Sequence, residues 1–428
     1  MCDFKYPKIL IVGRVAWTKD ESTLSGIFNG YPADMLAYIC IETRQPDISR
    51  CGKHFQISET AMIRRLFKWS TKTGNTITSV DFGIDKINER QEQAILNCIR
   101  SHRSIFYLYL RELLWLMGGW KTKTLKTFIL EFQPDVVFCV GDPLPLMNKL
   151  QRYVLKKANV PGAIFMMDDI FSYKTSHTLS QKIYRWLLRR QVRSLMGVCD
   201  AHFAISPKMQ RECDSLFGIH SVLLTKGIEI VAKPLDKIHQ PIKLVYTGNL
   251  LYGRMSTLAV VARTISSFNA SGHTKALLNI YTQTKLSKEQ RDLLEIEGVS
   301  QLHAPVAYND LPKIYEQSDI VLFVESLEEK NKYVARLSFS TKLTDYLASG
   351  RCIFAVGAAD TAPMEYLQEA KIAVTCGNEN EIEDNLLQLL THPNTIIELA
   401  ERSLNYGKEH HNSQLMHKRL LETIRSIV

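Results

Sequence analysis

The sequence predicts an α/β protein that contains two doubly wound parallel sheets. Short apolar runs recur along the chain, helical stretches separate most of them, and the series occurs twice. The runs are apolar on both faces, which is typical of parallel strands covered by helices on either side. In the first half, the expected strands are residues 8–13, 35–42, 135–141, 162–168, 201–206 and 222–227. In the second half, they are residues 242–248, 276–283, 301–305, 320–326, 352–357 and 372–376.

A polar, proline-containing stretch divides the two series of strands. It indicates a first domain over residues 1–232 and a second over residues 241–395, each with a Rossmann-like pattern. Residues 396–428 contain helical patterns and no further strand, so they are expected to form C-terminal helices. Between the second and third strands the pattern is less regular, with a helix expected over residues 91–116.

Composition excludes several classes of protein. The chain has 428 residues, of which 45% are hydrophobic and 23% charged, as in ordinary globular proteins rather than disordered ones. No run reaches the roughly 20 apolar residues that a membrane-spanning helix needs. The nine cysteines form no Cys-x-x-Cys pair. They are expected to be reduced thiols of a cytoplasmic protein.

The positive charge is concentrated in the first half of the chain. Residues 1–240 hold 34 Lys and Arg against 22 Asp and Glu, whereas residues 241–428 hold 19 against 22. A basic domain suits nucleic acid, anionic lipid or a phosphorylated substrate. No nucleic-acid recognition motif with interleaved aromatic residues is present, so nucleic acid is not expected as a partner. Basic segments with aromatic residues at 63–72, 115–128 and 181–193 instead indicate peripheral contact with an anionic membrane.

The most informative candidate site spans residues 338–350. Ser340 and Thr341 can cap a helix that begins near Lys342, and Asp345 follows one turn later. The N-terminus of a helix offers backbone N–H groups and partial positive charge, which suit a phosphate group. The lysine would add a full charge, and the aspartate could accept hydrogen bonds from sugar hydroxyls. An ordinary capped helix packed on a sheet would have the same pattern.

Other candidates follow the ends of expected strands, where open parallel sheets bind ligands. Gly248 permits close approach of the backbone, and Arg254 could contact a diphosphate with two hydrogen bonds. A surface arginine would fit the pattern equally well. Arg14 follows the first strand, but there is neither a GxGxxG motif nor a P-loop.

Two adjacent carboxylates follow the fourth expected strand. Asp168 and Asp169 could orient an acceptor or act as a base, and a helix cap with a solvated acid is the alternative. Asp-x-Asp, a common arrangement for a divalent cation on a diphosphate, is absent. No metal and no other cofactor is therefore expected.

The second half resembles the donor domain of a GT-B glycosyltransferase, specifically glycosyltransferase family 4. Residues 338–342 align with the family's Gly-Phe-Gly-Leu-Pro stretch, and Asp345 falls on its second acid, five residues before Gly350. Gly248 to Arg254 partly matches the family's Gly-Arg…Lys loop. Two departures are Leu337 in place of the first acid and the lack of the acceptor-site histidine, unless Asp168 or Asp169 replaces it.

The resemblance implies a GT-B architecture, with two Rossmann-like domains facing a cleft and C-terminal helices returning to the first. It implies transfer of a sugar, with retention, from a nucleoside diphosphate sugar to a glycan or lipid-linked acceptor in bacterial surface polysaccharide synthesis. The expected location is cytoplasmic, on the inner face of the membrane. Asp168 and Asp169 would be catalytic. The implied donor-binding residues are Arg14, Gly248, Arg254, Val306, Ser340, Thr341, Lys342 and Asp345. A sugar-nucleotide epimerase of GT-B type and a non-catalytic glycan-assembly subunit remain alternatives.

Overall fold

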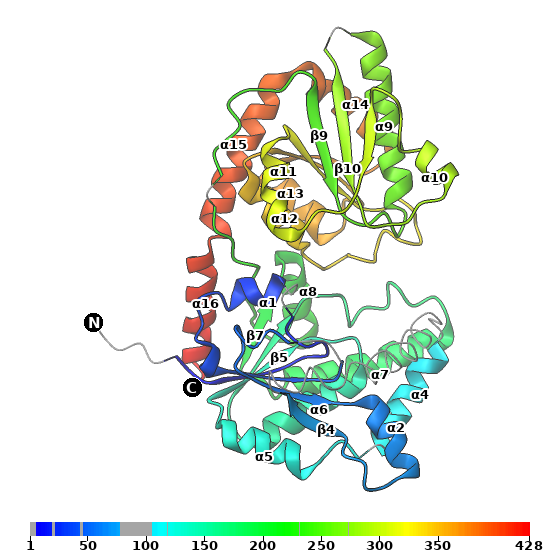
Figure 1. Cartoon of the computed structure of the whole chain (residues 1–428). Coiled ribbons are helices and arrows are strands. Elements are labelled where there is room, and N and C mark those ends of the chain that lie inside the picture. The colour runs from blue at the N-terminus through cyan, green and yellow to red at the C-terminus, as the bar shows by residue number, and fades with distance from the viewer. Residues whose placement is uncertain are drawn as a thin grey trace, which may run out of the picture. The chain divides into compact units, whose positions relative to one another are not determined.

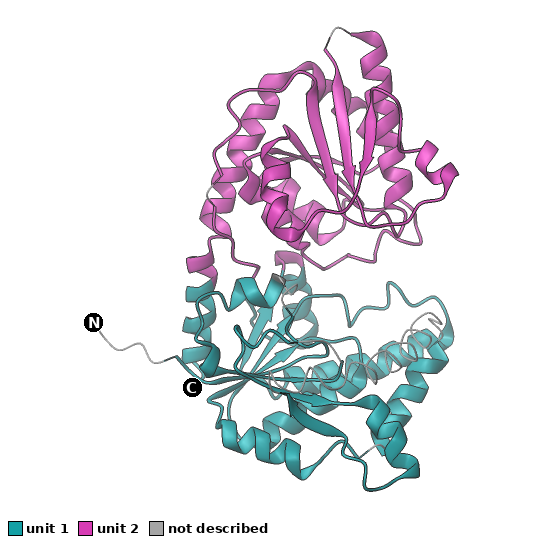
Figure 2. Cartoon of the chain, in the orientation of Figure 1, with its two compact units in different colours: residues 1–205, 209–224, 417–428 teal, residues 206–208, 225–416 magenta. Residues whose placement is uncertain are grey.

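The structure is a computed structural model that describes most of the chain in two compact units. The described residues are 6–18, 22–42, 46–77, 105–117, 119–230, 232–272 and 274–428. The first unit comprises residues 1–205, 209–224 and 417–428, and the second comprises residues 206–208 and 225–416 (Figure 2). The division near residue 224 precedes the polar stretch expected to separate the domains. Residues 91–104 of the helix expected at 91–116 lie outside the described residues.

The first unit is built on an eight-stranded sheet (Figure 1). Its order is β4-β3-β2-β1-β5-β6-β7-β8, and every pair is parallel except β3 with β4. The six strands from β3 to β7 have the order 3-2-1-4-5-6 of a Rossmann fold. The strands are β1 (Ile9–Val12), β2 (Leu36–Cys40), β3 (Lys53–Ile57), β4 (Gly74–Ile77), β5 (Val136–Val140), β6 (Gly162–Met166), β7 (Ala201–Ala204) and β8 (Val222–Leu223).

Two of these strands, β3 and β4, were not expected. Both strands contain polar residues and are only partly buried, and β4 is an edge strand. A short strand with polar residues and a partly solvated face lacks the continuous apolar run that revealed the central strands. The helices of this unit are α1 (Ser22–Ile27), α2 (Glu59–Phe67), α4 (Ile105–Met117), α5 (Lys123–Phe132), α6 (Pro145–Ala158), α7 (Leu179–Met196) and α8 (Pro207–Phe217).

The second unit has a six-stranded, wholly parallel sheet with the order β11-β10-β9-β12-β13-β14. This is again the Rossmann order. The strands are β9 (Ile242–Thr247), β10 (Ala276–Tyr281), β11 (Ser300–His303), β12 (Ile320–Val324), β13 (Cys352–Val356) and β14 (Ala373–Cys376). The helices are α9 (Arg254–Ser271), α10 (Lys288–Asp292), α11 (Leu311–Glu316), α12 (Thr341–Ser349), α13 (Ala362–Ala370), α14 (Glu379–Thr391) and α15 (Pro393–His410).

Buried strands and helices form the core of the second unit. Leu244, Tyr246 and Leu278 from the strands pack with Leu258 and Ile265 of α9 in one cluster. Every residue of β12 and β13 is buried, as expected of strands covered on both faces. The prediction of two doubly wound parallel sheets is confirmed.

The C-terminal helix α16 (Ser413–Arg425) connects to the first unit. Its residues Leu420 and Ile424 are fully buried, and Arg419 donates a hydrogen bond to the backbone oxygen of Leu223 at 3.5 Å. The expected return of the C-terminus to the first domain therefore begins at residue 417, while α15 belongs to the second unit. None of the helices among the described residues combines the length and apolar character required to cross a bilayer.

Candidate functional site

The second unit gathers functional groups where its strand order reverses. Strands β9 and β12 are neighbours in the sheet, and their connections run in opposite directions. In open α/β sheets, the crevice beyond the carboxyl ends of two such strands is the usual ligand site. Here the end of β9 leads into residues 248–254, and β12 is followed by Glu325 and Ser326.

Two glycines allow the loop after β9 to pass close to its neighbours. Gly248 has a φ of 142°, and a Cβ at this position would lie 2.1 Å from Nζ of Lys342. Gly253 has a φ of 79°, and a Cβ there would lie 2.3 Å from Oγ of Ser326. Any side chain would therefore displace the loop from the start of α12 or from the end of β12.

Arg254 is held firmly within the site. Its guanidinium donates hydrogen bonds to both carboxylate oxygens of Glu325, the shortest at 2.7 Å, and to Oδ1 of Asn249 at 2.8 Å. Both members of the ion pair are mostly buried, with 14% and 19% of their side chains exposed. The planar fork of an arginine favours such paired contacts with a carboxylate. In this structure Arg254 therefore braces the loop against the end of β12.

The helix α12 begins at the same edge of the sheet. Ser340 is its N-cap residue, with extended backbone angles, and its side chain makes no capping hydrogen bond. One face of the helix packs into the core, where Leu343, Tyr346 and Leu347 are fully buried. The hydroxyl of Tyr346 also donates a hydrogen bond to the backbone oxygen of Leu322 on β12 at 3.1 Å. A rigid helix N-terminus whose N-cap side chain does not occupy the backbone N–H groups is suited to bind an anion.

Lys342 adds a cation to this helix start. Its ammonium lies 5.0 Å from the centre of the Tyr246 ring, a cation–π arrangement. Among the described residues, no acid forms an ion pair with it. Burial, together with the nearby charge of Arg254, lowers the pKa of Lys342 to about 8. An anionic ligand that bound beside this ammonium would stabilise its charged form, because no described carboxylate does so through an ion pair.

A second group of polar side chains surrounds Asp345 on α12. The ammonium of Lys226 lies 2.5 Å from Oδ1 of Asp345 and 2.6 Å from the hydroxyl of Tyr308, and that hydroxyl also donates to Asp345 at 3.2 Å. Burial opposes the charged form of Lys226, yet Asp345 and Tyr308 hold the pKa of this lysine above its ordinary value. The lysine side chain is only 8% exposed, so the charge of Asp345 compensates it inside the protein.

The residues expected to bind a donor are distributed over both units. Gly248, Arg254, Ser340, Thr341, Lys342 and Asp345 come together in the second unit through the contacts above. Val306 lies between β11 and the short 3-10 helix at Tyr308–Asp310, where it is half-buried. Leu337, in place of the family's first acid, is fully buried, and its backbone oxygen accepts a hydrogen bond from Ser206 at 2.9 Å.

Arg14 occupies an equivalent position in the first unit. It follows β1, and its Nε lies 3.0 Å from a carboxylate oxygen of Asp142, which follows β5, the neighbouring strand. Glu42 after β2 lies within 3.9 Å of the same atom. Burial, partly offset by Arg14 and Arg111, raises the pKa of Asp142 to about 6. Each unit thus pairs an arginine after its first strand with an acid after its fourth Rossmann strand.

The two adjacent aspartates in the first unit have different surroundings. Asp169 accepts hydrogen bonds from the amide of Ser172 at 3.0 Å and from its hydroxyl at 2.5 Å, and therefore stabilises the turn after β6. Asp168 is exposed, and its backbone oxygen accepts from Ile170. Asp168 is therefore the more accessible of the two carboxylates.

Four charged residues of these sites were missed from the sequence: Glu325, Lys226, Asp142 and Glu42. All lie near the carboxyl ends of expected strands, at 320–326, 222–227, 135–141 and 35–42. Examining every charged residue at those ends would have identified them. Which of these ends become neighbours depends on the order of strands in each sheet, which single strands do not specify.

Two Rossmann-like units in one chain define the GT-B fold, and comparison with known proteins agrees. Residues 275–422 match a protein-family model described as glycosyl transferase-like. The structure resembles that of Anabaena Alr3699/HepE in complex with UDP and glucose, with a TM-score of 0.62, 11% identity and coverage of 98% of this chain and 100% of that one. No curated protein matches the chain.

Two further solved structures share the architecture. One is described as trehalose-6-phosphate from E. coli bound with UDP-2-fluoro glucose. It has a TM-score of 0.59 and 11% identity, and the match covers 98% of this chain and 99% of that one. The other is TarM, with a TM-score of 0.53, 13% identity and coverage of 70% of this chain and 58% of that one. At such low identities the likeness establishes the fold.

Proposed function

We propose that the protein transfers a sugar from a nucleoside diphosphate sugar to a glycan or lipid-linked acceptor. The observation that carries the proposal is the placement of Lys342 at the start of α12, against the Gly248 loop and without a paired acid among the described residues. This arrangement offers a cation and helix amides to a diphosphate at the usual ligand-binding edge of a Rossmann sheet. The match to a glycosyl transferase-like family and the UDP bound by HepE support it.

In the proposed reaction, the diphosphate leaves as the bond to the sugar breaks. Lys342 and the first amides of α12, at Ser340 and Thr341, stabilise the negative charge that develops on it. Removing one such preorganised donor typically slows an enzyme ~100- to 1,000-fold. Asp345, with Tyr308 beside it, binds nucleoside hydroxyls, and Val306 contacts the base. Arg254 acts by holding the Gly248 loop, because its own donors are bound to Glu325 and Asn249.

The proposal extends to the acceptor and the setting. Asp168, as the exposed carboxylate after β6, faces the acceptor, while Asp169 maintains the turn. We propose the retaining chemistry of family 4, no metal, and a role in bacterial surface polysaccharide synthesis on the cytoplasmic face. The described cysteines at positions 40, 51, 139, 199, 213, 352 and 376 are free and buried, which fits a reducing compartment.

Binding and turnover test the proposal separately. Titration calorimetry with UDP, UDP-glucose and other nucleoside diphosphate sugars should reveal at least one ligand. Lys342→Ala should bind it at least tenfold more weakly, because a hydrogen bond to a charged group contributes ~1.5–3 kcal/mol. Lys288→Ala, on the exposed helix α10 of the same unit, is the matched control and should bind like the wild type.

Product analysis distinguishes the enzyme from its alternatives. Transfer of the sugar to a glycan or lipid-linked acceptor supports the proposal. Isomerised donor without transfer would identify an epimerase. Binding without any turnover would identify a non-catalytic subunit, an alternative favoured by the buried Leu337 where the related enzymes have an acid. Equal affinity of Lys342→Ala and wild type would remove α12 from the donor site.

A further inference from the structure

Three helices of the first unit present rows of apolar side chains to solvent. On α4, Phe106, Leu110, Leu113 and Met117 recur at spacings of four, three and four residues, which places them on one face. Their exposures are 65%, 50%, 47% and 56%. A helix in a globular protein ordinarily turns such a row toward the core. Here the part of the chain that the structure describes does not bury this row.

The helices α2 and α7 extend the same pattern. Phe67 at the end of α2 and Trp69 just after it are 87% and 83% exposed. On α7, Leu179, Ile183 and Trp186 recur at helical spacing and are 75%, 48% and 52% exposed. We call these five residues and the four of α4 together the apolar face; its nine members are Phe67, Trp69, Phe106, Leu110, Leu113, Met117, Leu179, Ile183 and Trp186.

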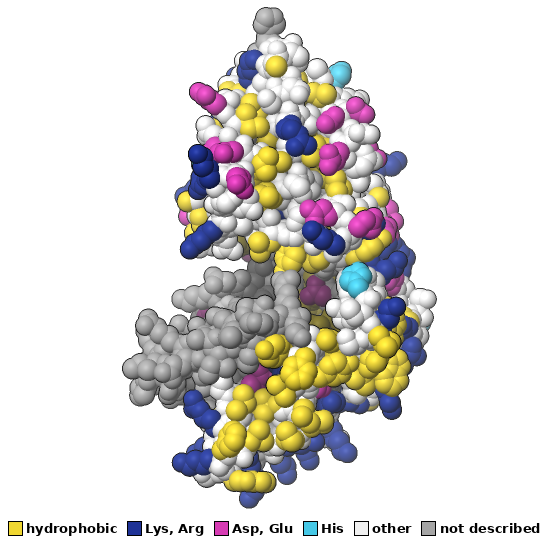
Figure 3. Space-filling view, turned by 90° about the vertical axis from the view of Figure 1, so that its right-hand side faces the viewer, with side chains coloured by type: hydrophobic (Ala, Val, Ile, Leu, Met, Phe, Trp, Pro, Cys, Tyr) yellow, Lys and Arg dark blue, Asp and Glu magenta, His cyan; other side chains and the backbone are white. Residues whose placement is uncertain are grey.

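Hydrogen bonds join these three helices into one surface. Glu59 of α2 accepts from Arg111 at 2.7 Å and from the indole of Trp115 at 2.6 Å, both on α4. Tyr109 of α4 donates to the backbone oxygen of Ser180 on α7 at 3.1 Å. Figure 3 shows hydrophobic side chains gathered in a broad band on this unit, with Lys and Arg along its margin. Exposed patches of this kind mark interaction sites.

On the three described helices that carry the apolar face, the exposed charges have one sign. The only acids on α2, α4 and α7, all of them fully described, are Glu59 and Glu112, and both form ion pairs with cations of the same unit. The exposed charged residues of these helices and of the turn after α2 are basic: Arg64, Lys68, Lys182, Arg190 and Arg193. An apolar surface bordered by cations complements an anionic lipid surface.

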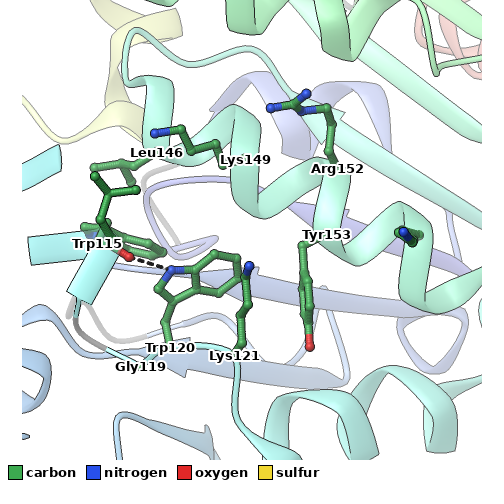
Figure 4. Close-up of a pocket in the computed structure, with 10 residues that line it drawn as sticks. Trp115, Gly119, Trp120, Lys121, Leu146, Lys149, Arg152 and Tyr153 are labelled. Atoms are coloured by element: carbon green, nitrogen blue, oxygen red, sulfur yellow. Dashed lines mark hydrogen bonds between the residues drawn. The ribbon is translucent and has the colours of Figure 1, made fainter. Parts of the chain in front are cut away.

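A basic pocket adjoins the apolar face. Its volume is about 450 Å³, and Leu116 of α4, 70% exposed, lies on its rim. Figure 4 shows Lys121 between the rings of Trp120 and Tyr153, and the ammonium lies 5.2 and 5.7 Å from the two ring centres. Lys149, Arg152 and Lys156 complete the basic lining.

The cations of the pocket differ in whether they already have hydrogen-bond or ion-pair partners within the protein. Lys149 pairs with Glu112 at 3.3 Å, and Arg152 donates to Ser194 at 2.5 Å and to Gln191. Lys121 and Lys156 are exposed, and among the described residues no acid pairs with either. The pocket therefore has two ammonium groups that no described carboxylate pairs with, and one of them, that of Lys121, lies beside two aromatic rings. Its volume suits a phosphate headgroup.

We propose that the first unit docks on an anionic membrane, with the apolar face entering the interface and the basic pocket binding a lipid phosphate. Tryptophan is well suited to the interface, since its large apolar ring carries one polar N–H. Trp69 after α2 and Trp186 on α7 therefore act as interfacial anchors of the face. This proposal stands on the first unit alone and does not depend on the donor site or on catalysis.

The experiment measures binding of the full chain to vesicles of phosphatidylcholine alone or mixed with phosphatidylglycerol, at low and high salt. We expect the wild type to cosediment with the anionic vesicles at low salt. Phe67→Ser combined with Trp69→Ser should weaken binding at least tenfold. Lys121→Gln combined with Lys156→Gln should weaken binding about tenfold, and only on anionic vesicles, because each variant residue has lost a positive charge that the anionic leaflet attracts.

Matched controls come from the second unit. Leu293→Ser removes an apolar side chain that is 51% exposed, and Lys285→Gln with Lys288→Gln removes two exposed cations. Both should bind vesicles like the wild type. Melting temperatures check that every variant is folded, which is expected because the substituted side chains are exposed. Quenching of tryptophan fluorescence by brominated lipid should occur in the wild type and diminish in the Trp69 variant.

Three results would overturn the proposal. One is failure of the wild type to bind anionic vesicles at low salt. Another is equal binding by the wild type and the Phe67 and Trp69 variant. The third is a dimer, measured by light scattering, that depends on Phe67 and Trp69 while vesicles are not bound, because the apolar face would then be a protein interface.

Discussion

Gly248 and Lys342 approach so closely that a Cβ at Gly248 would lie 2.1 Å from Nζ of the lysine. The loop after β9 can therefore pack against the start of α12 only because residue 248 is a glycine and has no side chain. Because Lys342 is the cation expected to meet the diphosphate, the position of this loop controls the position of the charge.

Gly248→Ala should therefore weaken binding of the nucleoside diphosphate sugar at least tenfold. The methyl group must displace either the ammonium or the loop, and the φ of 142° is unfavourable for alanine. Calorimetric titration measures the effect. Gly298→Ala is the control, because Gly298 also has a positive φ, 71°, but open space around its Cβ position. Similar losses of affinity in both variants would show that backbone strain, rather than contact with Lys342, is responsible.

Affinity for the diphosphate should fall as the pH rises from 7 to 9. The pKa of Lys342 is lowered to about 8, so the lysine loses its positive charge within this range. The phosphates are already ionised, since phosphate groups titrate near ~6. Lys342→Arg should bind with little dependence on pH here, because a guanidinium stays protonated. A wild-type affinity that is constant over the range would contradict the assignment.

The same lowered pKa has the opposite effect on the stability of the ligand-free protein. Between pH 8 and the ordinary lysine value of ~10.4, the unfolded chain holds a proton at this residue that the folded protein has released. The contribution of Lys342 to the free energy of unfolding should therefore increase as the pH rises through this window, and urea unfolding should shift to higher denaturant concentration. The difference between wild type and Lys342→Met across the window isolates its contribution.

Asp345→Asn should destabilise the protein as well as weaken donor binding. It leaves the ammonium of Lys226, only 8% exposed, without its carboxylate, and breaking a buried pair in this way costs about 3 kcal/mol. Urea unfolding measures the loss. Glu295→Gln, which breaks the exposed pair with Arg291, should cost less than about 1 kcal/mol.

The double variant Lys226→Met and Asp345→Asn separates the two roles of Asp345. It removes the uncompensated charge, so most of the lost stability should return. Donor affinity should remain low if the carboxylate binds the nucleoside. Recovery of both stability and affinity would mean that Asp345 serves only to compensate Lys226.

Turnover should persist in excess EDTA. The reason is that Lys342 and the start of α12 already supply positive charge to the diphosphate, and the sequence lacks Asp-x-Asp. Initial rates with and without the chelator, at fixed donor concentration, measure this. Loss of activity in EDTA that is restored by Mg²⁺ or Mn²⁺ would refute the metal-free proposal.

Local sequence was sufficient for much of the fold. The expected strand at 352–357 became β13, and the helix expected after Ser338 became α12, because an apolar run and a helix start are patterns of residues close together in the chain. The expected side-chain cap from Ser340 did not form. The strands β3 and β4 escaped prediction, since a short strand with polar residues is defined by the strand it pairs with rather than by its own apolar residues.

The sequence by itself determined two Rossmann-like series of strands, a basic first half, and a helix start carrying Lys342 and Asp345. Only the tertiary structure decided which charges meet. Lys226 and Asp345 are 119 positions apart, and Arg254 and Glu325 are 71 apart. Apolar periodicity is a property of residues that are close together in the chain. An ion pair at the edge of a sheet instead depends on which strand ends the fold brings together. The strands β9 and β12 become neighbours only when the parallel sheet has formed in its Rossmann order.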